Sequence, residues 1–168
     1  EMRVLLTKTS SLALLFAAAI ALVFGFNLWT PSAGGTLLDG IGPALEAQEL
    51  LASMSETQKT AHFRMTLWLD MLFPLAYGGF FAGMVLRNFE KPGVWLAIPA
   101  FLVIPIDIAE NVIQLIALSG NESLLGAKSL LTPTKFALFN VAAVIAFASL
   151  MSSGIRLLLN TRKNRPNE

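Results

Sequence analysis

The sequence contains no cysteine and only one histidine, and this removes several kinds of chemistry. Disulfides, thiolate metal sites and cysteine nucleophiles are excluded, and one histidine cannot build a histidine-rich zinc site. Charged residues make up only 14% of the chain, whereas a soluble domain carries about 25%. The net charge is +1 and the basic residues lie at the ends of apolar segments, so we expect no nucleic-acid-binding face.

Apolar residues are abundant instead: 55% of the chain is hydrophobic and the mean hydropathy is +0.65. Four apolar stretches are each long enough to cross a hydrocarbon core of about 30 Å. We therefore predict an all-α polytopic membrane protein, an antiparallel bundle of four transmembrane helices that forms a single domain. The predicted helices cover residues 11–29, 61–86, 94–118 and 133–159, with an extracytoplasmic loop 30–60 and a cytoplasmic tail 160–168.

Local signals indicate where some of these helices begin. Ser55-Glu56-Thr57-Gln58 has the spacing of a capping box, so the second helix should start there in water and enter the bilayer near Ala61. Thr132-Pro133 is a good N-cap and first-turn pair for the fourth helix. Within the loop, residues 44–54 predict a short amphipathic helix that caps the bundle.

The distribution of Lys and Arg predicts the orientation in the membrane. One side would carry Arg3, Lys8, Arg87, Lys91, Arg156, Arg162, Lys163 and Arg165, and the other Lys59, Arg64, Lys128 and Lys135. The positive-inside rule then places both termini in the cytoplasm. The membrane we expect is a bacterial inner (plasma) membrane. The alternative for the first apolar run is a signal peptide, which Ser32-Ala33-Gly34 fits loosely.

Acidic residues lie inside two of the apolar segments. Asp70 is in the second, and Asp107, Glu110, Asn111 and Gln114 are spaced i, i+3, i+4 and i+7 on one face of the third. A charged side chain at the centre of a membrane helix costs about 2.5 to 3.5 kcal/mol, so these carboxylates need compensation. Counted from the basic turn near Phe89, the three acids lie at the same depth, and we expect them to meet.

Residues from the other segments lie at a similar depth and complete a predicted outward-facing polar pocket. Tyr77 would supply a hydroxyl at its floor, and Asn140 would reach it from the fourth helix. The predicted charge partners just above are His62, Arg64 and Lys135, although His62 also fits a surface or capping position. Pro74 and Pro105 each leave a helical carbonyl without its donor, which predicts kinks.

Three interpretations of the acids stay open. They could form a structural network, either neutralised by Arg64 and Lys135 or protonated, or a site that binds or conducts a cation, proton, or small polar or lipid headgroup ligand. The third is a divalent-metal-dependent enzyme acting on lipid, with Mg, Ca or Mn held by Asp70, Asp107 and Glu110. Apart from a divalent cation we expect no cofactor, and no Walker loop, nucleophile elbow or HExxH motif is present.

Small residues recur on the first and fourth predicted helices: Ala13, Ala17, Ala21 and Gly25, and Ala142, Ala146, Ser149 and Ser153. Such stripes let helices approach closely in a membrane. They predict helix packing, and they motivate a further alternative in which the chain is an accessory or scaffold subunit, as a homo-oligomer or with a membrane-complex partner.

Two strings carry a resemblance: Leu69-Asp70-Met71-Leu72-Phe73-Pro74-Leu75-Ala76-Tyr77, followed by Asp107-Ile108-Ala109-Glu110-Asn111. They resemble a group of small four-helix integral membrane proteins of bacteria that has no established activity. The resemblance covers the central helical hairpin best. It implies the fold and the pairing of the two strings, and it implies no function.

Overall fold

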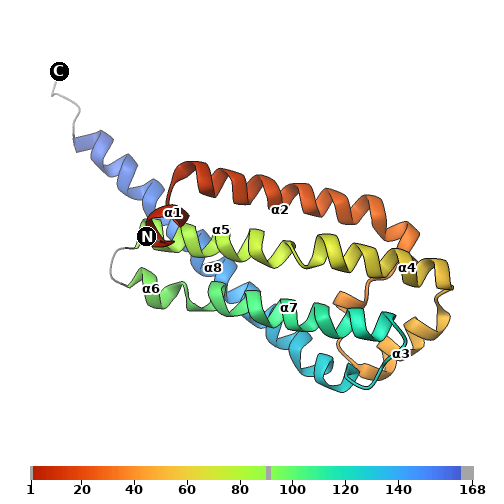
Figure 1. Ribbon diagram of the computed structural model, residues 1–168. Coiled ribbons are helices and arrows are strands. Elements are labelled where there is room, and N and C mark those ends of the chain that lie inside the picture. Colours follow the sequence, from red (N-terminus) through yellow and green to blue (C-terminus); the bar gives the residue numbers. More distant parts are fainter. Residues whose placement is uncertain (1, 90–91, 164–168) are drawn as a thin grey trace.

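The computed structural model describes residues 2–89 and 92–163, and this part of the chain is all-helical (Figure 1). Lys91 and the tail residues 164–168 lie outside the described residues. The elements in chain order are α1 (Met2–Leu6), α2 (Thr9–Trp29), η1 (Thr30–Ala33), η2 (Leu38–Gly40), α3 (Ala44–Ser53), α4 (Glu56–Met65), η3 (Thr66–Asp70), α5 (Phe73–Asn88), α6 (Gly93–Leu96), α7 (Ile98–Leu118) and α8 (Leu125–Lys163).

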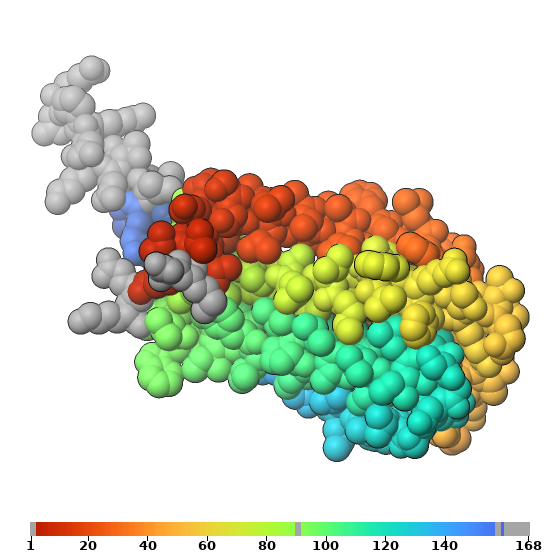
Figure 2. All heavy atoms as spheres, viewed as in Figure 1, coloured from red at the N-terminus to blue at the C-terminus, as the bar shows by residue number. Residues whose placement is uncertain are grey.

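Four helical stretches are long and apolar enough to cross a membrane: Thr9–Ala33, Glu56–Asn88, Gly93–Leu118 and Leu125–Arg156. The first is peripheral, because only 6% of its most apolar window is buried, against 50% for Glu56–Asn88. Figure 2 shows α2 as a ridge along α4 and α5, with much of its surface facing outward. Large apolar side chains such as Leu14, Phe24 and Phe147 are exposed on the outside of the bundle.

The second stretch is interrupted next to Pro74, as the sequence predicts. Segment η3 is a π-helix in which the N–H of Met71 donates to the carbonyl of Thr66 at 3.1 Å, and α5 begins only at Phe73. Proline has no N–H, so the helical donor for the carbonyl of Asp70 is missing. Helix α7, in contrast, continues through Pro105.

Two predicted helix starts have opposite outcomes. The capping box of α4 is confirmed, since Ser55 and Gln58 bond reciprocally. The predicted start at residue 133 is wrong, because α8 begins at Leu125. Leu125 is buried against the segment that carries Leu38, and Lys128 Nζ donates to the carbonyl of Leu38 in that segment. These contacts outweigh the helical hydrogen bond lost at Pro133. The predicted tail also starts too early, since α8 continues to Lys163.

The two ends of the bundle are built differently. At the end with α1 and α6, buried small residues let α5, α7 and α8 approach closely, among them Ala82, Ala100, Ala142 and Ala146 (Figure 1). At the other end, the segment from η2 to α3 folds over the ends of α7 and α8. Its apolar side, with Leu38, Ala47, Leu51 and Met54, packs on Ala117, Leu118 and Leu125. The segment therefore caps the bundle beside the polar residues described next.

The two predicted small-residue stripes differ in use. On α8, Ala142, Ala146 and Ser149 are buried. On α2, Ala13, Ala17 and Ala21 are exposed, so no other part of the described chain covers them. The expectation that a neighbouring helix packs on the first stripe is therefore wrong within a single chain. Helix α2 packs on its partners through other residues, such as the buried Leu12.

Candidate functional site

The buried ammonium group of Lys135 lies among three carboxylates at the capped end of the bundle. Lys135 Nζ is 2.8 Å from Glu110 Oε2 and 3.6 Å from Asp107 Oδ1, and it forms a short ion pair with Asp39 Oδ1. The Lys135 side chain is only 4% exposed. Charges this deeply buried are tolerated only when they are paired and hydrogen-bonded, and this arrangement meets both conditions.

A second buried lysine ties this cluster to the capping loop. Lys128 Nζ lies 3.0 Å from Glu110 Oε1 and donates to the carbonyls of Leu38 at 2.7 Å and Ile41 at 2.5 Å. The hydroxyl of Thr132 donates to the same Glu110 oxygen at 2.6 Å. Glu110 is therefore contacted on both carboxylate oxygens, and the loop that carries Asp39 is fixed to α8.

Helical spacing explains why these residues meet. Lys128, Thr132 and Lys135 are four and three residues apart, so they share one face of α8. The opposing face of α7 carries the predicted stripe Asp107, Glu110, Asn111 and Gln114, and all four residues are buried. Gln114 Nε2 donates to Asn111 Oδ1 at 3.3 Å and to Asp39 Oδ1 at 3.4 Å, which links the stripe to the loop.

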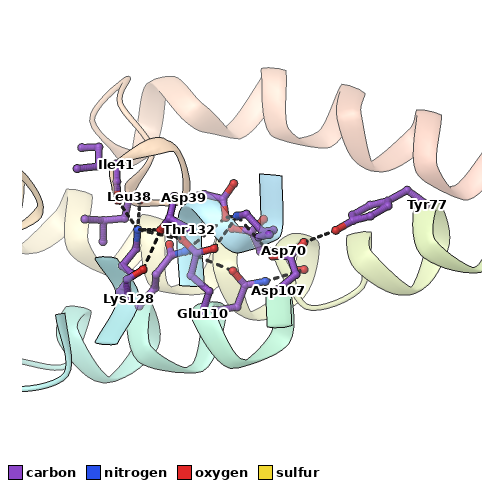
Figure 3. Close-up of polar contacts among 12 residues, drawn as sticks. Leu38, Asp39, Ile41, Asp70, Tyr77, Asp107, Glu110, Lys128 and Thr132 are labelled. Atoms are coloured by element: carbon purple, nitrogen blue, oxygen red, sulfur yellow. Dashed lines mark hydrogen bonds and ion pairs between the residues drawn. The ribbon is translucent and has the colours of Figure 1, made fainter. Parts of the chain in front are cut away.

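The interrupted second helix, Glu56–Asn88, also contacts the polar face of α7. Tyr77 Oη donates to Asp107 Oδ2 at 2.7 Å, so the tyrosine hydroxyl contacts the acidic cluster (Figure 3). Asn111 Nδ2 donates to the carbonyl of Asp70 at 3.0 Å. That carbonyl is the one that Pro74 leaves without a helical donor. The side chain of Asn111 on α7 thus supplies the hydrogen bond that the interrupted helix does not make.

A cavity of about 120 Å³ lies beside these contacts. Its lining residues are Asp39, Asp70, Phe73, Tyr77, Asp107, Lys135, Phe136 and Phe139. Asp70 is 5% exposed, and its Oδ2 has no hydrogen-bond partner among the residues that the structure describes. Asp107 and Asp39, in contrast, are both paired with Lys135. One buried carboxyl group that lines the cavity therefore has an oxygen without a hydrogen-bond partner among the described residues.

Three predicted site residues do not reach this pocket as expected. Asn140 and Arg64 are exposed, so neither joins the buried cluster. Asn140 follows Lys135 by five positions, which is a rotation of about 140° around the helix, so equal depth does not bring it to the same face. His62 is fully buried and accepts a hydrogen bond from the N–H of Leu38 at 3.4 Å. His62 therefore helps to fix the segment that covers this end of the bundle. The predicted surface position is wrong, because the side chain is buried.

Asp39 and Lys128 are site residues that the sequence reasoning missed. The predicted start of the fourth helix at residue 133 leaves Lys128 in a loop, so this prediction does not place Lys128 on the face of α8. Asp39 lies in a Gly-rich loop whose path cannot be derived from periodicity. A signal for Asp39 does exist: it is the only charged residue between Lys8 and Glu46. A lone charge in so long an apolar region needs a buried partner or water.

The predicted metal ligands need revision. Carboxylate oxygens of Asp39, Asp107 and Glu110 lie within 4.8 Å of one another, so Asp39 takes the place expected for Asp70. The ammonium of Lys135 contacts all three. A divalent cation bound by these oxygens would need the same space and would be repelled by Lys135. The three carboxylates therefore do not fit a metal while Lys135 is in this position.

Comparison of the chain with protein-family models, with curated proteins and with solved structures finds no match. The case for a function therefore rests on the geometry of this site.

Proposed function

We propose that the four long apolar helices span a membrane in alternating directions, with both termini on the cytoplasmic side of a bacterial inner membrane. The charge distribution supports this orientation. At the capped end of the bundle, Lys128 and Lys135 belong to the buried cluster. Among the described residues, this leaves Lys59 and Arg64 as the basic residues of that end outside the cluster. The end with α1 carries Arg3, Lys8, Arg87 and Arg156. An excess of Lys and Arg is typical of the cytoplasmic side.

Within this membrane domain, the cavity beside Asp70 binds a small cation. The observation that carries the proposal is the buried carboxyl group of Asp70: the residue lines a cavity, and its Oδ2 has no hydrogen-bond partner among the described residues. A buried carboxyl without a partner is costly, and a bound cation would supply the missing interaction. The charges agree: the carboxyl groups Asp39, Asp70, Asp107 and Glu110 outnumber the two ammonium groups Lys128 and Lys135.

The test is thermal unfolding of the purified full chain in detergent, with sodium, potassium, calcium or methylammonium chloride. Tetrapropylammonium chloride is too bulky for the cavity and serves as the reference at equal ionic strength. At a hundred times its dissociation constant, a bound cation adds about 2.7 kcal/mol to the free energy of unfolding. We expect at least one small cation to stabilise the wild type in this way but not the Asp70→Asn variant.

The matched control is Glu49→Gln, which removes an exposed carboxylate of the capping helix α3. It should respond to cations as the wild type does. Equal stabilisation of Asp70→Asn and wild type by every cation would show that the effect is general screening and would refute the proposed site.

A second candidate is a structural subunit that associates through α2. The exposed stripe of Ala13, Ala17 and Ala21 favours it, since small residues on an outward helix face allow another helix to approach. The occupant we propose is a second copy of this chain. Cross-linking in native membranes should give a dimer that Ala17→Leu abolishes while Leu14→Ala, a change beside the stripe, does not. A monomer in every sample would remove this candidate.

A further inference from the structure

We propose that the ligand of the Asp70 cavity is an ammonium group with at least one N–H, carried on an apolar or aromatic body. A membrane lipid with a primary amine headgroup and a free hydrophobic amine both present this chemistry. The inference rests on the proposed cation site and narrows its ligand class.

The cavity wall is half aromatic, which separates organic ammonium groups from hard metal ions. Four of its eight lining residues are aromatic, and the other four are charged: Phe73, Tyr77, Phe136 and Phe139, with Asp39, Asp70, Asp107 and Lys135. The Tyr77 ring packs edge-to-face against Phe73 and Phe139, with both centroid distances 5.0 Å. Aromatic faces attract ammonium groups, whereas Mg²⁺ and Ca²⁺ require a shell of oxygen ligands. The chain already shows this preference, because Lys135 Nζ lies 5.0 Å from the centroid of Phe136.

The carboxyl group of Asp70 sets a second requirement for the ligand, namely an N–H that it can donate. The Asp70 carboxyl group lines the cavity, and its Oδ2 lacks a donor among the described residues, so a ligand that donates an N–H to this carboxyl group supplies the missing interaction. A primary ammonium can donate this bond and a quaternary ammonium cannot. Phosphatidylethanolamine and phosphatidylcholine differ in this respect at the same position of the headgroup. The geometry therefore favours the ethanolamine headgroup.

The cavity is reached from the flank of the bundle. Phe136 is its most exposed lining residue, at 43%, and lies on α8. The end of the bundle next to the cluster is covered by the capping segment, which Lys128 and His62 hold in place. A ligand would therefore arrive from the apolar phase beside Phe136. A volume of about 120 Å³ holds about four waters at about 30 Å³ each, so it accepts the ammonium end of a ligand and leaves the rest of the ligand outside.

The experiment uses the full chain in nanodiscs of phosphatidylglycerol with either phosphatidylethanolamine or phosphatidylcholine added. Native mass spectrometry counts the lipids retained after mild detergent release, and 2-phenylethylammonium and sodium are titrated as competitors. We expect phosphatidylethanolamine to be retained about tenfold or more in preference to phosphatidylcholine, because a hydrogen bond to a charged group is worth that much in affinity. The preference should disappear in Asp70→Asn, weaken in Phe136→Leu and persist in Glu49→Gln.

The outcomes separate the sources and the two proposals. Retention of the ethanolamine lipid identifies a lipid ligand, while binding of 2-phenylethylammonium alone identifies a soluble amine, and both support the inference. Equal retention of the two lipids with no binding of the free amine overturns it. Stabilisation by sodium or calcium that depends on Asp70, without amine binding, overturns this inference but leaves the proposed cation site. If Asp70→Asn does not fold, unchanged ammonium selectivity in Phe136→Leu overturns the inference instead.

Discussion

One face of α8 packs the two ends of the bundle by opposite means. The residues of this face alternate in steps of four and three: Lys128, Thr132, Lys135, Phe139, Ala142, Ala146, Ser149 and Ser153. Its first part holds buried charges, and its last part holds small residues that let α5 lie close. The long polar side chains bridge helices and a loop, whereas the small ones bring backbones together. The same heptad-like spacing thus supports a buried charged cluster at one end and tight packing at the other.

The difference lies in how each end tolerates change. At the charged end, removal of one member leaves its partners buried without compensation, so the cost is electrostatic. At the small-residue end there are no such partners, and the cost arises when added atoms collide with a neighbour. Substitutions at the two ends should therefore differ in size and in what restores stability.

The largest effect is expected for Lys135→Met, which keeps the volume and removes the charge. Asp39, Asp107 and Glu110 would be left with oxygens within 4.8 Å of one another and without their shared cation. Breaking a buried pair of this kind costs about 3 to 5 kcal/mol. The free energy of unfolding in detergent measures it.

The control for this prediction is Lys59→Met. Lys59 pairs with an exposed Glu56 at 3.1 Å, and such surface pairs contribute about 0.2 to 0.5 kcal/mol. Calcium should restore part of the stability of Lys135→Met, because the three carboxylates then have room for a divalent ion. If Lys135→Met and Lys59→Met were equally stable, the cluster would not be the compensated network described.

An intermediate effect is expected at the small-residue end from Gly83→Ala. A Cβ at Gly83 would lie 2.6 Å from the carbonyl oxygen of Leu6 and 2.7 Å from Leu12 Cδ2. Overpacking of this kind costs about 1 to 3 kcal/mol, and added cations should not reverse it. Thermal unfolding in detergent measures the difference.

The matched change is Gly126→Ala, in the first turn of α8. A Cβ there meets nothing within 4 Å, so alanine should stabilise the helix by about 0.5 to 1 kcal/mol. A loss of stability at Gly126 as large as that at Gly83 would mean that the close approach of α1 to α5 is not the cause.

The sequence predicted most accurately what depends on helical periodicity. Four long apolar helices are present as predicted, although the fourth begins eight residues earlier than expected, and the polar face of α7 is buried because its spacing alone defines it. What failed depends on tertiary contacts. Asn140 was placed by depth without its rotation around the helix, and Asp39 reaches the cluster along a loop path that only the fold sets.

The start of α8 shows the same limit. Thr132-Pro133 is a strong local signal for a helix beginning, yet the turn before it is helical because Leu125 and Lys128 are anchored in the capping loop. Thr132 then serves the cluster through its bond to Glu110. Local propensity was overridden by contacts between distant segments, which a single sequence does not display.

The smallest effect is expected for Pro74→Ala, at the junction between η3 and α5. Pro74→Ala restores an N–H that can donate to the carbonyl of Asp70, in competition with the bond from Asn111 Nδ2. Alone, this change should alter the free energy of unfolding by less than about 1 kcal/mol, since one donor replaces another. Asn111→Ala should then cost less in the Pro74→Ala background than in the wild type, with a coupling of about 0.5 to 1.5 kcal/mol. A double-mutant cycle of thermal stabilities measures this coupling. Strictly additive effects would mean that the π-helix persists for a reason other than the missing proline donor, and that the opening beside Asp70 does not depend on Asn111.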